Sequence, residues 1–364
     1  MRIFDVISYL ETKFPLSSQA GFDNCGVQVG DVFRPLEGVL IALDCTEEIV
    51  DEAIEIGANL IVAHHPLIFK PLKSLTGKNY IEKTLLKAIE NKIVIYAIHT
   101  NLDHHISGVN AEIARRIGVV NPQILLPSEH ALFKIAVYVP LESKEQVLNA
   151  LFSAGAGAVG DYTNCSFSAP GIGTFQPGEN TNPYVGEIGK TEFVDEIKLE
   201  VLVTKHNLSK ALQLMFDAHP YEEVAYDVLS LENQNQYEGT GMIGELENPI
   251  DELTFLAMLK QRFHCKTIRH TKLLGRKIKS VAFCGGSGSF LLKNAIQKRA
   301  DIFITGDFKY HEFFDAEEKI VIADIGHYES EQFTSDLIYA FLNEKFVNFA
   351  IRVTKVNTNP INYF

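Results

Sequence analysis

The sequence predicts an α/β fold, in which two α/β halves form one mixed, largely parallel-sheet domain that is interrupted by an inserted α+β domain. Three observations predict it. Short apolar runs alternate with amphipathic helical patterns near the start of the chain, the same alternation returns near its end, and a segment of different pattern separates them. A chain of 364 residues exceeds most single cores, which indicates two domains, residues 1–127 with 236–364 and residues 128–235.

The first half alternates strand and helix at a spacing that needs crossover connections, so its strands are expected to be parallel. Thr46 precedes one helical pattern as a candidate N-cap, and Gly57 and Gly118 stand at two expected helix ends. The far half repeats this rhythm. The expected strands are residues 37–44, 58–65, 93–100, 280–286, 301–307, 320–326 and 348–353, and the expected helices are residues 46–57, 79–92, 108–118, 289–300, 310–319 and 328–346.

The middle segment follows a different plan. Its order of strand, helix, strand, helix and strand indicates the split βαβ plan of ferredoxin-like domains. Residues 168–186, rich in glycine, proline and asparagine, are interpreted as a loop, and a loop of this length in a compact domain usually has a purpose. An insertion between two halves of one domain is the simplest account. The expected elements are residues 132–140, 143–155, 198–205, 208–220 and 224–231.

Composition narrows the class of function. The formal net charge is −13 and the only dense basic run, residues 269–279, is interpreted as a solvated hairpin or loop, which disfavours direct nucleic-acid binding. No apolar run approaches the ~20 residues of a membrane span, and the first residues lack the apolar core of a signal peptide, which predicts a cytoplasmic protein. The five cysteines are scattered without a CxxC pair, which predicts reduced thiols.

The run "AHHP" places His64 and His65 where a buried strand stops, and Pro66 disfavours a helix at that point. In open α/β sheets, ligands bind beyond the carboxyl ends of strands, so both imidazoles are candidate metal ligands. Two ordinary polar residues at a strand end fit the pattern equally well. Neighbouring side chains on a strand point to opposite faces, so the two histidines cannot easily serve one ligand from one face.

A second strand end holds His99, Asp103, His104 and His105 within seven positions. A carboxylate together with imidazoles is the usual ligand mixture for zinc, manganese or iron. The alternative is that Asp103 caps the following helix and the histidines lie at the surface.

Two further strand ends carry a pair of residues four positions apart. His327 and Glu331 would share one face of a helix and could form a metal clip, although such pairs are also common on surfaces. Asp307 and His311 are expected to support a metal site or to carry protons beside it, with helix capping by Asp307 as the alternative.

Residues 283–290, "FCGGSGSF", form a glycine-rich turn between a strand and a helix. Such a turn can hold phosphate on its backbone N–H groups, but it lacks the lysine of a P-loop and the full GxGxxG spacing. The alternative is that glycine lets the backbone pass close to a metal region.

The motifs "AHHPLIF", "HTNLD", the "GD…HE" segment and "GHYESE", in this order, resemble the NIF-three-like family, whose members are labelled GTP cyclohydrolase 1 type 2 homologues. The resemblance covers nearly the whole chain, including the middle domain, which is similar to the PII and CutA type of fold. It implies two divalent metal ions per chain between the two halves, with zinc expected and iron or manganese as alternatives. The ligands that it implies are His64, His65, Asp103, His327 and Glu331.

The resemblance also implies that Glu331 bridges the two metals, that His99 and His311 lie nearby as proton carriers, and that the chain forms a toroidal homohexamer. A centre of this kind suits a metal-dependent hydrolase that acts on a small nucleotide-like or phosphorylated molecule. The alternative is a regulatory or metal-handling assembly in which the inserted domain binds an effector or gates access. In either case, His64 and His65 could each serve a different metal.

Overall fold

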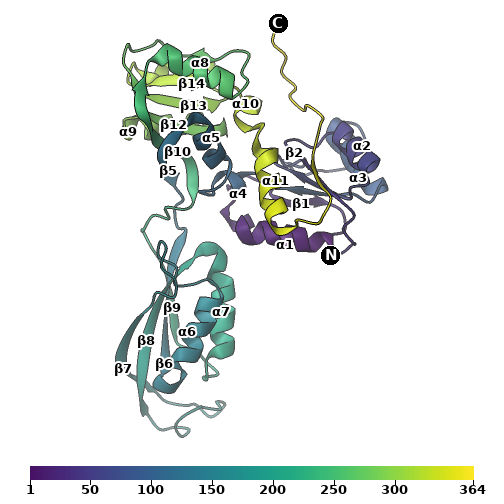
Figure 1. Cartoon of the computed structure of the whole chain (residues 1–364). Coiled ribbons are helices and arrows are strands. Elements are labelled where there is room, and N and C mark those ends of the chain that lie inside the picture. Colours follow the sequence, from purple (N-terminus) through teal and green to yellow (C-terminus); the bar gives the residue numbers. More distant parts are fainter. The chain divides into compact units, whose positions relative to one another are not determined.

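The computed structural model describes all 364 residues, which divide into two compact units (Figure 1). The first unit comprises Met1–Pro127 and Gln236–Phe364, and the second comprises Ser128–Asn235. The fold is a mixed α/β fold with several sheets. None of its helices has the length and the apolar character that crossing a membrane requires.

The first half of unit one is built on a five-stranded sheet with the order β1-β4-β3-β2-β15. All neighbours are parallel except β1, which is antiparallel to β4. Every residue of β2, β3 and β4 is buried, which is why these strands read as continuous apolar runs. The elements are α1 (Ile3–Lys13), η1 (Leu16–Ser18), β1 (Gly26–Val29), β2 (Val39–Ala42), α2 (Glu47–Ile56), β3 (Leu60–Ala63), α3 (Tyr80–Glu90), β4 (Val94–Ala97), α4 (Thr100–Asp103), α5 (Val109–Ile117) and, from the far end, β15 (Ile351–Val353).

The second half has a sheet of its own, with the order β11-β14-β13-β12-β10-β5. Only the β12–β13 and β13–β14 pairs are parallel, so this sheet is mixed and not largely parallel as expected. The long strands that flank the insertion, β5 and β10, pair antiparallel with each other and extend the sheet. The elements are β5 (Val119–Pro127), β10 (Gly239–Ile250), α8 (Glu252–Arg262), β11 (Arg269–His270), β12 (Ile278–Ser287), η3 (Ser289–Leu291), α9 (Leu292–Gln297), β13 (Ile302–Gly306), η4 (Tyr310–Ala316), β14 (Val321–Asp324), α10 (His327–Glu331) and α11 (Thr334–Lys345).

Several local expectations need correction. The helix expected over residues 328–346 is two helices, α10 and α11, and the helix expected over residues 310–319 is the 3₁₀ helix η4. Thr46 stands at the N-cap of α2, but its hydroxyl forms no capping hydrogen bond. Gly57 and Gly118 end α2 and α5 in the left-handed conformation, with φ of 73° and 80°, as the sequence predicts.

One hydrophobic cluster joins the two sheets of unit one. It includes Leu10 and Phe14 of α1, Ile113 of α5 and Ile338 of α11, together with inward side chains of both sheets. Helices α5 and α11 contact each other, and α5 also packs on β12 while α11 packs on β2 and β15. Because these helices share a core with both sheets, they hold the two sheets in a fixed relation within this unit.

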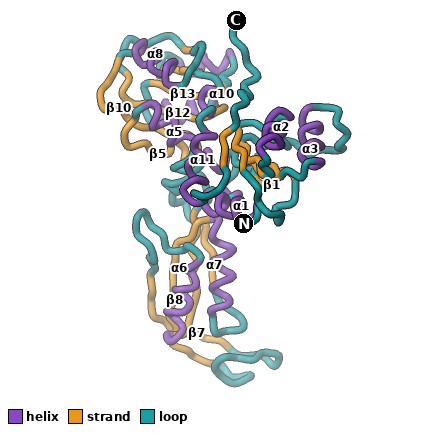
Figure 2. The backbone as a smooth tube through the Cα atoms, turned by 45° about the vertical axis from the view of Figure 1, so that its right-hand side comes forward, coloured by secondary structure: helices purple, strands orange, loops and turns teal.

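The inserted unit is a four-stranded antiparallel sheet with the order β7-β8-β6-β9. Both of its longer helices, α6 and α7, cover one face of the sheet (Figures 1 and 2). Ile135, Val137 and Leu199 point toward these helices and pack with Leu151 and Met215. The elements are β6 (Leu132–Pro140), η2 (Leu141–Ser143), α6 (Lys144–Ser153), β7 (Phe167–Phe175), β8 (Glu192–Thr204), α7 (Lys205–Ala218) and β9 (Tyr226–Ser230).

The stretch 168–186, interpreted as a loop, is a strand over its first eight residues because β7 extends to Phe175. Strand β7 lies at the edge of the sheet, where Pro170 is tolerated because an edge strand needs only one set of backbone hydrogen bonds. Composition alone pointed to a loop, whereas pairing with β8 along the whole of β7 decides the structure.

Candidate metal centre

The candidate site lies beyond the carboxyl ends of strands from both sheets of unit one. His64 and His65 follow β3 directly, and His99 follows β4. His327 begins α10, shortly after β14 ends at Asp324. Parallel strands direct their carboxyl ends to one edge of a sheet, so side chains that are distant in sequence meet there.

Glycine makes the turn between β14 and α10 possible. Gly326 adopts φ of 95°, a conformation that favours glycine, and a Cβ atom there would lie 2.2 Å from the Glu329 carboxylate. A Cβ atom on Gly306, at the end of β13, would lie 2.7 Å from the backbone nitrogen of His327. These two glycines therefore allow α10 to begin close against β13.

Three overlapping groups of side chains have ligand atoms within 4.8 Å of one another. Glu331 belongs to two of them and uses a different oxygen in each. Its Oε1 atom lies 3.9 Å from His64 Nε2, whereas its Oε2 atom lies 3.0 Å from His65 Nε2 and 3.1 Å from His327 Nε2. The groups are His64, Asp103 and Glu331; His65, His327 and Glu331; and His64, His65 and His99.

Three of the four histidines lie near Glu331, and each of these three has its Nδ1 atom held by an oxygen. His64 Nδ1 lies 2.8 Å from the carbonyl oxygen of Ile98, which can only accept a hydrogen bond. His65 Nδ1 lies 2.7 Å from Asp44, and His327 Nδ1 lies 2.7 Å from Asp307. Each Nδ1 therefore donates a hydrogen bond, and each Nε2 faces the Glu331 carboxylate. Metal-bound histidines in proteins usually have their second ring nitrogen fixed by an oxygen in this way.

Two atoms of the site are buried and have no hydrogen-bond partner: His64 Nε2 and Asp103 Oδ1, which lie 3.6 Å apart. Buried polar atoms are rarely left without a partner, because the loss of water costs ~1–3 kcal/mol when nothing replaces it. An imidazole nitrogen and a carboxylate oxygen are both ligands of divalent cations. The residues present therefore fit a metal ion.

The electrostatics of the cluster follow from its buried carboxylates. Burial opposes the charged form of His65, but Asp44 and Glu331 outweigh it and raise the pKa of His65 to about 10. Burial likewise opposes the charge of His327, while Glu331 and Asp307 raise its pKa to about 11. Burial raises the pKa of Asp103. In the metal-free cluster, protonated His65 and His327 thus balance the negative charge of the buried carboxylates.

His99 is the fourth histidine of the three groups, and it is tied to Asp23. Its Nδ1 lies 2.9 Å from Asp23 Oδ1. Although burial opposes it, hydrogen bonds from His99 and Thr100 lower the pKa of Asp23. His99 therefore has a charged carboxylate on one side and the His64 and His65 rings on the other, with ring centroids 5.2 and 5.3 Å away.

The structure does not bring His311 into the cluster. His311 is exposed, and its ring lies against Tyr310 and Phe314. The resemblance implied that His311 lies beside the metals as a proton carrier, but its helix η4 is a 3₁₀ helix that begins at Tyr310, and His311 belongs to none of the three groups. His104 and His105 are also outside the three groups, and His104 Nδ1 bonds to the carbonyl of Ser18.

The glycine-rich turn passes beside Glu331. A Cβ atom on Gly286 would lie 2.3 Å from Glu331 Oε1. The backbone N–H of Gly286 donates to Ser330 Oγ, and that of Gly285 donates to Asn110 Oδ1. Both N–H groups are therefore occupied and cannot hold a phosphate. The glycines are explained instead by the close approach of the backbone to Glu331.

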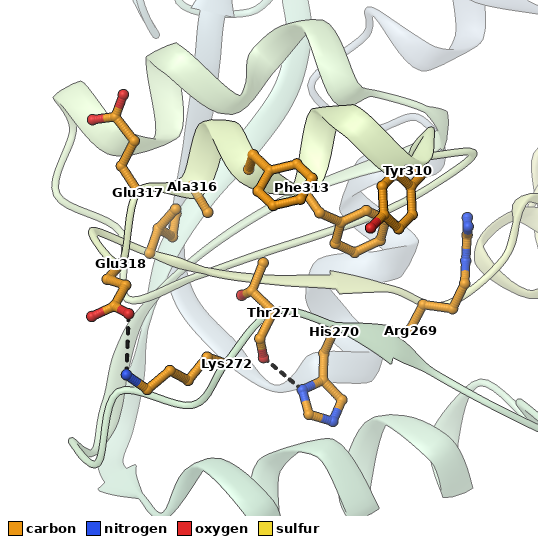
Figure 3. A pocket seen from close by; sticks show the side chains of 11 residues that line it. Arg269, His270, Thr271, Lys272, Tyr310, Phe313, Ala316, Glu317 and Glu318 are labelled. Atoms are coloured by element: carbon orange, nitrogen blue, oxygen red, sulfur yellow. Dashed lines mark hydrogen bonds and ion pairs between the residues drawn. The ribbon is translucent and has the colours of Figure 1, made fainter.

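A separate cavity of about 650 Å³ in unit one has no cluster of candidate metal ligands (Figure 3). Arg269, His270 and Lys272 line one side of it, with Tyr310 and Phe313 across the hollow. Its cations already have partners, because Lys272 pairs with Glu318 at 3.1 Å and Arg269 pairs with Asp324. It contains none of the metal-capable groups.

Sequence reasoning missed Asp44 and Asp23, which hold His65 and His99. Asp44 is the last residue of the expected strand 37–44 and lies two residues after β2, which pairs with β3, so its place at a neighbouring strand end was a usable signal. Its other oxygen accepts from the Thr358 hydroxyl at 2.7 Å. Asp23 lies in the segment between α1 and β1, 76 residues before His99, and no local pattern marks it.

Comparison with known proteins places the chain in a family. Residues 1–360 match the family model described as Duf34/NIF3 (NGG1p interacting factor 3). The chain belongs to this family. The resemblance inferred from the four motifs is thereby confirmed.

Relatives in the Duf34/NIF3 family match over their whole length. Proteins named GTP cyclohydrolase 1 type 2 homolog from Halalkalibacterium halodurans and Bacillus subtilis are 38% and 34% identical, each over 98% of this chain and over 98% and 97% of the relative. The crystal structure of a Bacillus cereus protein related to NIF3 has a TM-score of 0.85 at 37% identity and covers 100% of this chain and 99% of its own. The fold is therefore that of this Bacillus cereus relative over the full length of both chains.

Proposed function

We propose that unit one of this Duf34/NIF3 protein contains a dinuclear metal centre and that the protein is a metal-dependent hydrolase. The observation that supports this most directly is the Glu331 carboxylate, which turns one oxygen to His64 and the other to His65 and His327. One cation would be held by His64, Asp103 and Glu331, and a second by His65, His327 and Glu331. Zinc is our first choice, with iron or manganese as alternatives, because imidazole and carboxylate suit all three.

Divalent cations held in this way supply Lewis-acid activation of water and of a substrate oxygen. The protein's own residues would do the rest. Asp44 and Asp307 fix the orientation of His65 and His327 through their Nδ1 atoms. Asp23 engages the Nδ1 atom of His99, so the Nε2 atom of His99 would accept or deliver a proton beside the cluster.

We propose a small nucleotide-like or phosphorylated molecule as the substrate. The relatives carry the name GTP cyclohydrolase 1 type 2 homolog, which makes GTP one member of the panel to test. The test is hydrolysis of nucleotides and phosphoesters by metal-loaded protein, with Glu331→Gln as the inactive variant and circular dichroism as the check of its fold. Turnover that persists in metal-free protein or in Glu331→Gln would refute the hydrolase.

A second candidate function is a regulatory or metal-handling protein. The inserted unit favours it, because that unit is compact by itself and has a cavity of its own. No turnover of any panel member, together with metal release that depends on a ligand of the insert, would support this function over hydrolysis.

We also propose that the chain assembles as a toroidal homohexamer. Light scattering should then give a mass of six times the 40.7 kDa of one chain at micromolar concentration. A monomer or dimer mass would contradict it.

A further inference from the structure

A cavity of about 620 Å³ lies within the inserted unit. Strands β6, β7 and β8 and two connecting segments, residues 176–185 and 221–225, contribute to its lining. Its volume is within the ~300–1,000 Å³ that is usual for sites of small molecules. None of the candidate metal ligands lines it.

Four aromatic rings contribute to the lining. The Tyr221 ring lies 5.9 Å from the ring of Tyr184 and 6.4 Å from that of Phe175, and Tyr138 contributes a fourth ring from β6. Tyrosine and phenylalanine faces favour flat partners, and they attract cations through the negative face of the ring.

Every second residue of strand β7 along the cavity, from Ala169 to Gly173, has a small side chain or none. Ala169, Gly171 and Gly173 line it, and Gly171 is paired across the strands with Glu196. A Cβ atom on Gly171 would meet nothing within 4 Å, and its φ is not one that requires glycine. The backbone therefore does not explain this glycine, whereas the open space at its Cβ position does. At Gly173 the Glu196 carboxylate fills the corresponding space, because a Cβ atom there would lie 2.1 Å from Glu196 Oε2.

Two polar groups of the cavity, Glu196 and the Tyr221 hydroxyl, interact with each other. Glu196 forms no ion pair, because the neighbouring Lys198 pairs with Glu200 at 2.8 Å. The Tyr221 hydroxyl is buried and has no hydrogen bond of normal geometry, with the Glu196 carboxylate as its neighbour. Burial and the charge of Glu196 raise the pKa of Tyr221, so this hydroxyl remains a neutral donor.

The wall of the cavity is fastened by a hydrogen bond between the two connecting segments. The backbone N–H of Asn182 donates to Glu222 Oε1 at 2.9 Å. Glu223 also lines the cavity, so three carboxylates face one lysine that already has a partner. This balance disfavours phosphates and other anions and favours a cation.

We propose that the inserted unit binds a planar aromatic molecule that carries an amidinium or a protonated amine. The rings of Tyr184 and Tyr221 would stack on it, its cationic group would pair with Glu196, and the Tyr221 hydroxyl would orient that carboxylate. A site of this kind would account for the glycines of β7 and for the long connection that follows it, since both line the cavity. It does not depend on the metal centre or on the proposed hydrolase.

The test uses three single-ring probes of nearly the same shape and different charge: benzamidine, benzamide and benzoate. Binding to the full-length protein is measured by calorimetry and by saturation-transfer NMR. Benzamidine should bind at least about tenfold more tightly than benzamide, and benzoate should not bind, because the charge of Glu196 selects the cation. Glu196→Gln should remove the preference for benzamidine and leave benzamide binding unchanged.

Gly171→Val should abolish binding of all probes, because its side chain would fill open space without touching protein. Gly178→Val is the matched control: Gly178 also has open space around it but does not line the cavity. Equal binding of the three probes, no binding of any, or binding that survives Gly171→Val would overturn the proposal. So would a change of assembly mass in Gly171→Val, because it would show that another copy of the chain fills the cavity.

Discussion

His64 Nε2 and Asp103 Oδ1 lie 3.6 Å apart, and both are buried without a hydrogen-bond partner. Asp103 lies in the short helix α4 after β4, and His64 follows β3. The fold thus aims two ligand-type atoms at each other from neighbouring strands and leaves both unsatisfied. Such a pair is costly unless a third group lies between them, and a cation is the group that both atoms favour.

The first prediction concerns metal content. His64→Ala and His65→Ala should each lower the metal-to-chain ratio from about two to about one, because each histidine belongs to a different group with Glu331. Glu331→Ala should lower it further than either, since it removes an oxygen from both groups. The measurement is elemental analysis of protein purified without added metal. His311→Ala is the control, because this exposed histidine lies outside the groups, and its ratio should not change.

The second prediction concerns the carboxylates behind the histidines. Asp44→Asn and Asp307→Asn should each weaken metal binding by roughly 10–100-fold, because an amide holds the His65 or His327 Nδ1–H less strongly than a carboxylate does. Competition with a chromophoric chelator measures the affinity. Asp51→Asn provides the comparison, because Asp51 pairs only with Lys87 at the surface. An affinity unchanged in both Asp44→Asn and Asp307→Asn would contradict the assigned roles.

Much of the metal cluster could be predicted because its signals are local. His64 and His65 stand after a wholly apolar strand, and His327 and Glu331 stand four apart at the start of a helix. A strand end and a helical spacing are both visible in a short stretch of sequence. The resemblance to a family then joined these stretches, which spacing alone could not do.

The rest depended on contacts that no local pattern encodes. Asp23 reaches His99 across 76 positions, and the antiparallel pairing of β5 with β10 spans the whole insertion. Likewise, Pro170 and Gly171 read as loop residues until β8 pairs beside them. Tertiary pairing overrides composition in such places, so the second sheet and β7 became clear only in the structure.

The third prediction is a pH dependence of the metal-free protein. The pKa of His65 is about 10 and that of His327 about 11, both above the 6.5 of an unperturbed histidine. Between pH 6.5 and about 10–11, the two histidines of the folded chain hold protons that they have lost in the unfolded chain. The free energy of unfolding should therefore be highest near or below pH 6.5 and fall as the pH rises toward 10–11.

Urea denaturation at a series of pH values in the presence of a chelator measures this dependence. His65→Asn should flatten the slope, because it removes one of the two groups whose protons are lost. In metal-loaded protein the slope should also be flatter, since cations take the place of the protons. A free energy of unfolding that rises with pH over the same interval would contradict the assignment of the two histidines.

The last prediction concerns the backbone that carries His327. Gly306→Ala should destabilise the protein by about 1–3 kcal/mol, because its Cβ atom would lie 2.7 Å from the His327 backbone nitrogen and 2.9 Å from the Gly326 carbonyl carbon. If α10 instead shifts to relieve the contact, the His327 ring leaves Glu331 and metal content falls. Thermal unfolding and elemental analysis together detect either response. Gly21→Ala is the control, since nothing lies within 4 Å of its Cβ position. Unchanged stability together with unchanged metal content in Gly306→Ala would show that α10 does not depend on this close approach.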